Sequence, residues 1–230
     1  MSDLEGTQRR RRITKSIIDT ITSPGDRSKQ TSIGPSEIAN TCNYCVGKAL
    51  CRKYPELWWE EYSSPWDEGF SLAAWVGTAI HEKLEREHLY GVKESTVAVW
   101  ELPDYGPISG HVDLIQDDTV IDYKSAWKLN IRDYKLEGPP LKLQYQPHMY
   151  GLGVENTGGT VKDVCLFFIP RDSNNISDHW AGFSAYNRKA AERALQRLKN
   201  IWRMVQDKKG ADLDKAPDCF NCNQSYYLHN

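Results

Sequence analysis

Five of the six cysteines stand in two groups at opposite ends of the sequence, and no other feature constrains the fold as strongly. Cys42, Cys45 and Cys51 lie near the start, and Cys219 and Cys222 lie near the end. Two thiolates three positions apart can reach a common centre, so a CxxC at each end suits one tetrahedral metal ion or one cubane cluster. Such a centre would hold both ends of the chain together across the core. Unliganded, reduced thiols are the alternative.

The composition is that of a globular protein without a membrane span. The chain has 230 residues, of which 40% are apolar and 26% charged, and no apolar run approaches the length of a transmembrane helix. The N-terminal stretch MSDLEGTQRRRRITK lacks the apolar core of a secretory signal, so we expect a cytoplasmic protein with reduced or metal-bound cysteines. Cys165 lies in the apolar run VCLFFI and is expected in the core.

The charge distribution limits how the chain could contact nucleic acid. The formal net charge of -2 gives no overall attraction to a polyanion, so such a contact must come from local basic patches. The run from Arg9 to Arg12 is either part of a solvated arm or a contact with DNA. We therefore divide the chain into a flexible basic arm, 1–31, and a single domain, 32–230. Three tryptophans either pack in the core or offer surfaces on which bases stack: Trp58, Trp59 and Trp66.

The apolar periodicity predicts a mixture of helices and strands. Pro35 suits the first turn of a helix, and segment 71–91 carries an apolar residue at every fourth position, which indicates a long helix. Segments 95–102, 106–115 and 119–126 read as strands, the last two joined as a hairpin by a turn at 116–118. Beyond them we predict three more elements, namely a helix at 141–154 that contains Pro147, a buried strand at 161–170 and an amphipathic helix at 184–210.

Two acids on the predicted hairpin form a candidate metal site. Asp113 and Asp122 lie nearly opposite one another once the turn is counted, so their carboxylates can converge on one face. Their repulsion is relieved when Mg²⁺ or Mn²⁺ lies between them, because such ions take oxygen ligands and keep positions open for water and phosphate. Lys124 points to the same side of its strand as Asp122, where its ammonium can orient water or neutralise a phosphate. A charged, solvent-facing edge is the alternative.

Four motifs follow one another in a fixed order: GTAIHE on a helix, GHVD and DYK on neighbouring strands, and QYQPHMY on the next helix. Together they resemble the RecB-like branch of the PD-(D/E)XK nuclease superfamily, which includes the CRISPR-associated RecB-like exonucleases. The resemblance covers roughly residues 32–225. It implies an α/β fold with a restriction-endonuclease-like core, in which helices flank a central mixed sheet. It also implies a helical, cysteine-bearing lobe built from both termini, from about 32–70 and 211–230.

The resemblance assigns roles to individual residues. It implies that a divalent ion, Mg²⁺ or Mn²⁺, binds to His81, Asp113 and Asp122. The backbone carbonyl of Tyr123 is a further ligand, and Lys124 matches the catalytic lysine. Two residues of the following helix lie beside the site in relatives, where they help to hold the lysine and DNA: Gln146 and Tyr150.

The same relatives often carry a [4Fe-4S] cluster, bound by one cysteine before the nuclease core and three after it. This chain departs from that pattern, since three of its cysteines precede the core and two follow it. The ligand set that we prefer is Cys42, Cys45, Cys219 and Cys222, with Cys51 as the substitute for Cys45. The iron cluster follows from the resemblance, whereas the spacing allows zinc equally well. In either case we expect a structural role.

The resemblance thus implies a metal-dependent deoxyribonuclease that digests DNA from its ends, above all single-stranded ends. It would act in recombination, repair or end processing, in a bacterial cytoplasm or a phage-infected host, beside a recombination or helicase partner and without a membrane. Basic residues from Arg188 to Arg203 are either contacts with the DNA backbone or a solvated helix face. A non-catalytic DNA-binding protein that retains the fold and cluster is the main alternative. A zinc-stapled regulator is another.

Overall fold

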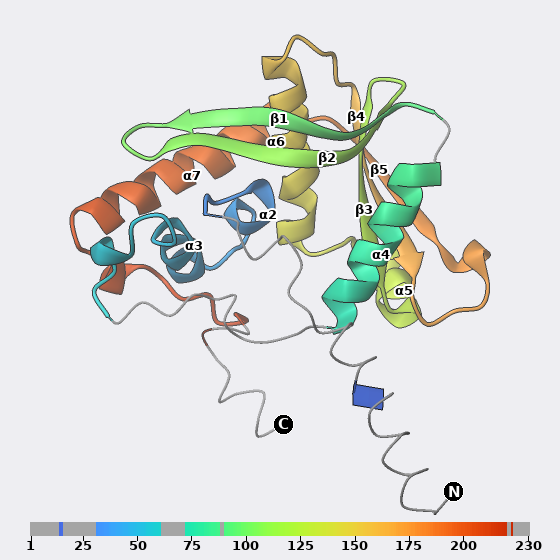
Figure 1. The fold of residues 1–230 in the computed structure, drawn as a ribbon, viewed down its shortest axis with the longest axis horizontal. Helices are drawn as coiled ribbons and strands as arrows, with labels where there is room; N and C mark the ends of the chain where they lie inside the picture. The colour runs from blue at the N-terminus through green and yellow to red at the C-terminus, as the bar shows by residue number, and fades with distance from the viewer. Residues whose placement is uncertain (1–13, 16–30, 61–71, 88–89, 220–221, 223–230) are drawn as a thin grey trace, which may run out of the picture.

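A five-stranded mixed sheet in the order β1-β2-β3-β4-β5 forms the centre of the computed structural model (Figure 1). The structure describes residues 14–15, 31–60, 72–87, 90–219 and 222. β2 pairs antiparallel with both β1 and β3, β4 runs parallel to β3, and β5 returns antiparallel to β4. The strands are β1 (Val92–Leu102), β2 (Gly106–Gln116), β3 (Thr119–Ala126), β4 (Asp163–Pro170) and β5 (Trp180–Ala185).

The β2-β3 hairpin has the predicted turn. Asp117 and Asp118 both have positive φ angles, 50° and 57°, which is the backbone of a tight turn whose twist matches that of the two strands. From this turn the antiparallel ladder runs as far as the pair Leu114–Ile121. The next pair in the same register is Asp113 and Asp122, so the two acids stand where the backbone ladder ends.

Helices flank the sheet, as the fold class predicted. α6 and α7 pack against one another, α6 also covers β1, and α4 lies against β3 (Figure 1). The parallel pair β3-β4 needs a long crossover, and α5 and α6 together supply it. The described helices of four or more residues from Pro35 onward are α2 (Pro35–Ile38), α3 (Asn43–Leu50), α4 (Leu72–Glu87), α5 (Lys128–Glu137), α6 (Leu141–Asn156) and α7 (Arg188–Gln206).

The main core lies between α7, α6, the N-terminal helices and the face of β1 and β2. α7 is amphipathic, and its buried stripe includes Leu195, Leu198 and Trp202, which recur at the three- to four-residue spacing of one helix face. Trp58 is buried and meets Tyr44 edge-on with ring centroids 5.3 Å apart. The packing interpretation of Trp58 is therefore confirmed. Trp59 packs partly buried against the same core, and Trp66 lies outside the described residues.

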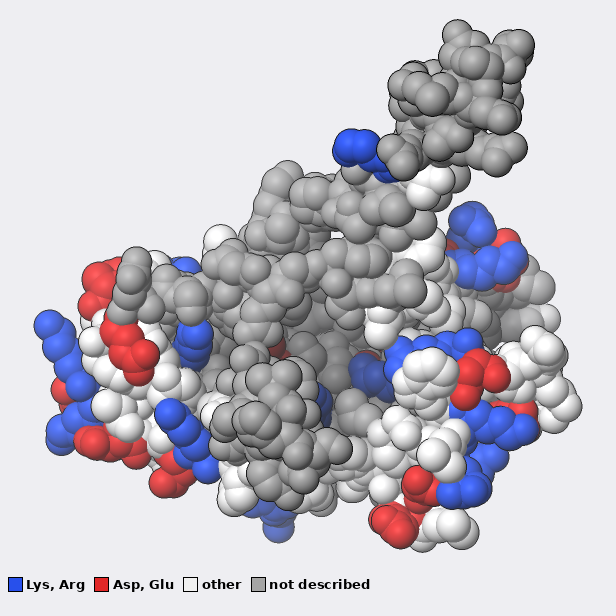
Figure 2. All heavy atoms as spheres, turned by 90° about the horizontal axis from the view of Figure 1, so that it is seen from below, with Lys and Arg blue, Asp and Glu red and all other residues white. Residues whose placement is uncertain are grey.

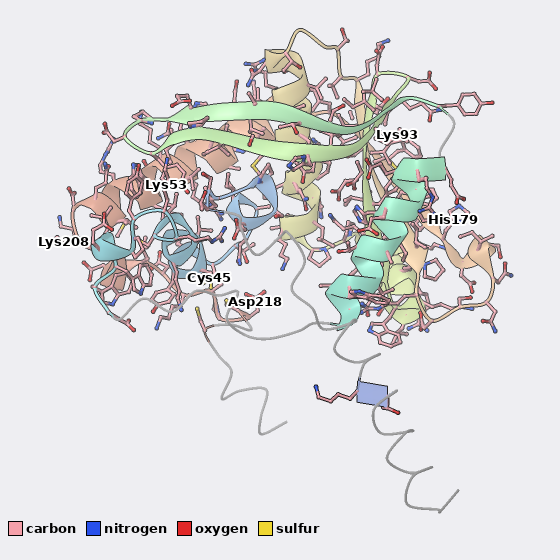
Figure 3. All side chains as sticks on the ribbon, in the orientation of Figure 1. Cys45, Lys53, Lys93, His179, Lys208 and Asp218 are labelled. Atoms are coloured by element: carbon pink, nitrogen blue, oxygen red, sulfur yellow. The ribbon has the colours of Figure 1, made fainter. Side chains whose placement is uncertain are left out.

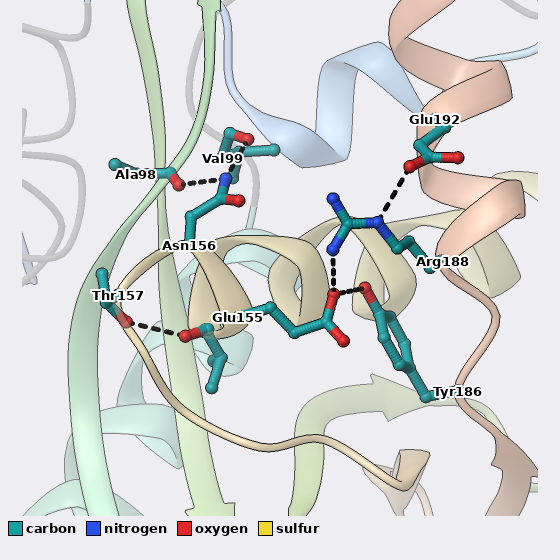
Figure 4. A network of polar contacts seen from close by, with 9 residues as sticks. Ala98, Val99, Glu155, Asn156, Thr157, Tyr186, Arg188 and Glu192 are labelled. Atoms are coloured by element: carbon teal, nitrogen blue, oxygen red, sulfur yellow. Dashed lines mark hydrogen bonds and ion pairs between the residues drawn. The ribbon is translucent and has the colours of Figure 1, made fainter.

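The C-terminal end of α6 fastens to β1 through a side-chain amide. The register of β1 against β2 shifts between Ala98 and Trp100, which marks a β-bulge. Nδ2 of Asn156 donates to the carbonyl oxygens of Ala98 and Val99, at 3.1 and 2.8 Å (Figure 4). The bulge therefore has its carbonyl groups satisfied by the helix that also carries two of the predicted site residues.

Most predicted elements are present, with corrections at their boundaries. The long helix begins at Arg188 rather than at residue 184, because Asn187 caps it by accepting a hydrogen bond from the Ala190 N–H at 3.1 Å. Residues 184–185 instead end β5, which was not predicted, and α5 was also missed. The cysteines near the start do not share the helix that Pro35 opens. They lie on the separate helix α3, with Cys51 directly after it.

Two further predictions concern the ends of the chain and the membrane. The basic arm, 1–31, lies almost wholly outside the described residues, so its boundary stays a prediction. Within the described part of the chain, no helix is both long enough and apolar enough to span a membrane.

Candidate active site and cysteine centre

Asp113 occupies the point at which β2 and β3 separate. Its Oδ2 accepts a hydrogen bond from the backbone N–H of Tyr123 at 2.7 Å, so the carboxylate takes the place of the next ladder bond. Its Oδ1 lies 3.0 Å from Nδ1 of His81 on α4. One carboxylate therefore connects β2, β3 and α4, and its orientation is fixed from two sides.

Asp122 is almost completely enclosed, with 2% of its side chain exposed. Its Oδ2 lies 2.6 Å from Nζ of Lys124, an ion pair in which the buried oxygen has no hydrogen bond of normal geometry. Burial raises the pKa of Asp122. The charge of Lys124 opposes this increase and the charge of Asp113 adds to it, and the net direction is upward. The protein thus holds Asp122 in surroundings that penalise its charged form.

His81 is half-buried on α4 and meets the ring of Tyr123 edge-on, with ring centroids 5.9 Å apart. Burial lowers the pKa of this imidazole, but the hydrogen bond with Asp113 and its negative charge outweigh that effect and raise the pKa overall. The charges of Lys124 and Asp122 also act on His81. The four predicted groups from α4, β2 and β3 therefore share one electrostatic neighbourhood.

These residues fit a hard divalent cation. The charge of Asp113 acts on Asp122, and Asp122 has a buried oxygen without a normal hydrogen bond, to which a cation could bind. Among the described residues, the one group of metal-binding side chains whose ligand atoms all lie within 4.8 Å of one another is formed by cysteines. His81, Asp113 and Asp122 are not drawn together to that extent, so an ion held by all three requires side-chain movements.

Gln146 and Tyr150 are both buried on α6 and bond to one another. Nε2 of Gln146 donates to the Tyr150 hydroxyl at 2.7 Å. The Tyr150 ring presses on Gly110 of β2, where an added Cβ would lie 2.6 Å from Tyr150 Cε1. Glycine at 110 is therefore required for this approach, three residues before Asp113. This hydrogen bond of Gln146 runs to Tyr150 and not to Lys124.

Four cysteines from both ends of the chain meet beside α3. Cys42 precedes α3 and Cys45 lies in its first turn, while the other two belong to the C-terminal segment. Figure 3 shows Cys45 beside Asp218, the neighbour of Cys219 in the sequence. The sulfur atoms of Cys45 and Cys219 are 3.4 Å apart, those of Cys45 and Cys222 are 3.5 Å apart, and those of Cys42 and Cys222 are 3.6 Å apart.

All four sulfurs of this cysteine centre lie within 4.8 Å of one another. The structure thus brings together the preferred set, Cys42, Cys45, Cys219 and Cys222. Cys51 is fully buried in the hydrophobic core and is not a member of the group, so it does not serve as the substitute.

Burial and hydrogen bonds shift the pKa values of the thiols of the centre in different directions. Burial raises the pKa of Cys45 strongly, and burial raises that of Cys222 to about 12. Burial also acts to raise the pKa of Cys42, but hydrogen bonds from the backbone of Ala216 and Cys45 outweigh it and lower the pKa overall. Thiols become thiolates when a metal binds, so the donor set fits a thiophilic ion or cluster.

Backbone and packing contacts fix the C-terminal segment to α3. The N–H of Tyr44 donates to the carbonyl of Asp214 at 3.1 Å. Leu213 fills the space above Gly47, where a Cβ would lie 2.4 Å from its Cδ1. These contacts hold the segment that leads to the second CxxC against α3 independently of a metal.

The basic residues proposed on the long helix are partly committed to contacts within the protein. Arg188 pairs with Glu155 at 2.9 Å and with Glu192 at 2.8 Å, and Tyr186 donates to the same Glu155 carboxylate (Figure 4). Arg197 donates to two backbone carbonyls near α2. On the face displayed in Figure 2, basic and acidic side chains are interspersed. If this helix contacts DNA, we therefore expect the contact from its basic residues other than Arg188 and Arg197.

One residue whose exposed surface suits base stacking was not predicted from the sequence. Trp127 follows β3, three residues after Lys124, and is 52% exposed. The guanidinium of Arg171 lies 4.7 Å from the centroid of its ring, and the Arg171 backbone N–H donates to Ala126 at 3.0 Å. An exposed indole beside a cation can stack on a nucleic-acid base. Its place directly after the DYK strand was the signal available in the sequence.

No described sequence family and no curated protein matches the chain. Solved structures do match. An alkaline exonuclease from Laribacter hongkongensis, LHK-Exo, superposes with a TM-score of 0.54 over 88% of this chain and 97% of that chain, at 7% identity. The same exonuclease in complex with dAMP gives 0.51 over 86% and 95%, at 9% identity. A protein named SSO0001 gives 0.51 over 85% and 87%, at 16% identity.

The likeness to LHK-Exo confirms the predicted fold. The chain shares the fold of LHK-Exo, with a central mixed sheet flanked by helices. Cysteines from near both ends of the chain add the cysteine centre to this fold.

Proposed function

We propose that this chain is a divalent-metal-dependent deoxyribonuclease that hydrolyses phosphodiester bonds from DNA ends, above all single-stranded ends. One observation carries the proposal. His81, Asp113, Asp122 and Lys124, which are scattered over the sequence, share one neighbourhood at the fork between β2 and β3. The fold around this fork is that of an alkaline exonuclease, which supports a nuclease further.

In this proposal each residue has a defined task. Asp113, Asp122 and His81, with the carbonyl of Tyr123, would hold Mg²⁺ or Mn²⁺, and the ion would supply Lewis acidity toward a phosphate oxygen. Hydrogen bonds with the Tyr123 N–H and with His81 hold the Asp113 carboxylate in place.

Lys124 is the candidate for handling water and charge. Its ammonium, 2.6 Å from Asp122 and 21% exposed, lies between the buried acid and solvent. There it can hold a water molecule in line for attack and neutralise charge that builds up on the phosphate. Gln146 and Tyr150 support the β2 side of the fork through the contact of Tyr150 with Gly110.

The preference for single-stranded ends rests on Trp127. A base stacked on this side chain would place single-stranded DNA beside the end of β3, the strand that carries Lys124. Base-aromatic stacking is worth roughly 1–3 kcal/mol per base and tolerates any sequence. The complex of LHK-Exo with dAMP supports a nucleotide ligand for this fold. A role in recombination, repair or end processing in a bacterial or phage-infected cell follows from the resemblance.

The cysteine centre is proposed to bind a structural metal. A metal that joins Cys45 to Cys219 closes a separation of 174 residues, which would remove about 5 kcal/mol of chain entropy from the unfolded state. No described contact of the four sulfurs involves the residues at the fork. The metal is therefore assigned to stability and not to hydrolysis.

A digestion assay tests the proposed activity. Linear single-stranded, linear duplex and circular single-stranded DNA are incubated with the full chain in Mn²⁺, in Mg²⁺ and in EDTA. We expect metal-dependent release of mononucleotides or short products from linear DNA, fastest from single strands, and protection of the circle.

Matched variants separate activity from contamination. Asp122→Ala should abolish digestion, whereas Asp118→Asn, at the exposed turn of the same hairpin, should retain it, because asparagine tolerates the positive φ of this turn. If the unmutated protein binds DNA but digests none of these substrates with either metal, the chain is a non-catalytic DNA-binding protein and the proposal fails.

A further inference from the structure

The spacing of the four sulfurs identifies the kind of metal that the cysteine centre can hold. We infer that Cys42, Cys45, Cys219 and Cys222 bind a single tetrahedral zinc ion rather than the [4Fe-4S] cluster that the resemblance implies. The sulfur-sulfur distances are 3.4, 3.5 and 3.6 Å for three of the pairs, and every pair is closer than 4.8 Å.

A single zinc ion fits these distances. Zinc-sulfur bonds of about 2.3 Å in a tetrahedron place neighbouring sulfurs about 3.8 Å apart. Small shifts of the thiols toward a common centre would therefore complete the site. A tetrathiolate zinc site has no open position, which agrees with a structural role.

An iron-sulfur cubane does not fit them. Its four irons occupy the centre of the site and the cysteine sulfurs bind outside them, so the sulfurs are separated by roughly 6 Å. The longest sulfur-sulfur distance in this centre is below 4.8 Å. To accommodate the cubane, every pair of sulfurs would have to move apart by more than 1 Å, both within each CxxC and between the two.

The surrounding contacts oppose such a separation. The hydrogen bond from the Tyr44 N–H to Asp214 ties the segment before the second CxxC to α3, and Leu213 is packed directly on Gly47. Each cysteine pair is also held in its own turn. The Val46 N–H donates to the Cys42 carbonyl at 3.2 Å, and the Cys222 N–H donates to that of Cys219 at 3.2 Å.

The order of the ligands agrees with the same conclusion, whereas their number, four, suits zinc and a cubane alike. The two pairs have identical CxxC spacing, and one pair comes from each end of the chain. A zinc site would explain why this order differs from the order in the iron-sulfur relatives, in which one cysteine precedes the core and three follow it. Cys51, which could have supplied another iron ligand, is buried in the core away from the centre. The four ligands that zinc requires are all present among the described residues.

Metal analysis of the full-length protein tests the inference. The chain is purified without oxygen from cells supplied with both iron and zinc, and its metals are quantified by mass spectrometry. We expect about one zinc per chain, little iron and a colourless solution. X-ray absorption at the zinc edge should show one shell of sulfur at about 2.3 Å and no neighbouring metal.

Variants and exchange supply the controls. Cys222→Ser should lose most of the zinc, whereas Cys51→Ala should keep it. Exchange of zinc for Co²⁺ in the unmutated protein should produce the intense blue-green absorption of a tetrahedral thiolate site, which remains informative if Cys222→Ser does not fold.

Three results would overturn the inference, namely several irons per chain with a brown colour, protein with neither metal, or zinc that Cys51→Ala removes. None of them bears on digestion by the fork residues, so the two proposals can fail separately.

Discussion

Replacing Asp122 with asparagine should have opposite effects on the stability of the protein with and without a divalent ion. The Asp122 side chain is 2% exposed, and its Oδ2 lacks a hydrogen bond of normal geometry. Asparagine has nearly the same shape and is also polar, so the substitution changes the charge of this buried group and little else. Burial outweighs the attraction of Lys124, because the net effect on the pKa of Asp122 is upward. Removing the charge should therefore stabilise the metal-free fold.

The expected size follows from these terms. Asp122→Asn removes the penalty for burying the charge and also the attraction of Lys124, and the penalty is the larger of the two, so the free energy of unfolding in EDTA should rise by on the order of 1 kcal/mol. For a chain of this length this corresponds to a rise in Tm of roughly 2–4 °C. In Mn²⁺ at 100 times its Kd, the unmutated protein should gain about 2.7 kcal/mol, which the variant lacks. The order of the two stabilities should thus reverse when Mn²⁺ is added.

Thermal unfolding in EDTA and in a Mn²⁺ series measures both effects. Asp118→Asn is the matched control, because Asp118 lies on the same hairpin in an exposed ion pair with Lys162. This control should change stability by less than about 1 kcal/mol and should keep the full response to Mn²⁺. The reasoning is refuted if Asp122→Asn is less stable than the unmutated protein in EDTA and gains as much from Mn²⁺.

Three other substitutions give distinct expectations. Lys124→Met should lower kcat by about 10²–10³-fold while the Mn²⁺-induced shift in Tm persists, and a lost shift would assign the lysine to metal binding instead. Trp127→Ala should weaken binding of single-stranded oligonucleotides by roughly 5- to 100-fold in fluorescence anisotropy, whereas Leu129→Ala, at an equally exposed apolar neighbour, should not. Gly110→Ala should lower the free energy of unfolding by about 1–3 kcal/mol, because the added methyl group overpacks the contact with Tyr150. Gly77→Ala should be neutral or stabilising, because an added Cβ makes ordinary contacts there and alanine favours a helix. Equal effects of the two substitutions would show that α6 does not pack tightly on β2.

The sequence predicted those elements in which the pattern of apolar and polar residues follows the pattern of buried and exposed side chains. The hairpin carrying Asp113 and Asp122 was predictable because its turn residues and alternating apolar residues agree. The strand 161–170 and the helix at 141–154 were predictable because both are largely buried. α5 was missed because Ile131 is its one buried residue, so it has no apolar stripe. β5 was missed because half of it is exposed.

The candidate site was only partly predictable for a related reason. Residue types and order indicated which side chains could take part, but the ladder ending at Leu114–Ile121, which lets Asp113 bond the Tyr123 backbone, is a property of three-dimensional packing. The role of Gly110 likewise depends on how closely α6 approaches β2. The cysteine spacing predicted a shared centre and left zinc and iron open, and the sulfur distances are the basis on which we infer zinc.

Anomalous diffraction from crystals of the full chain soaked in Mn²⁺ locates the ion directly. One strong manganese peak should lie at the fork between β2 and β3, bonded to carboxylate oxygens of Asp113 and Asp122 and to a ring nitrogen of His81. A soak that leaves the fork empty while manganese collects at another site, in crystals of protein that still digests DNA, would show that hydrolysis is carried out elsewhere.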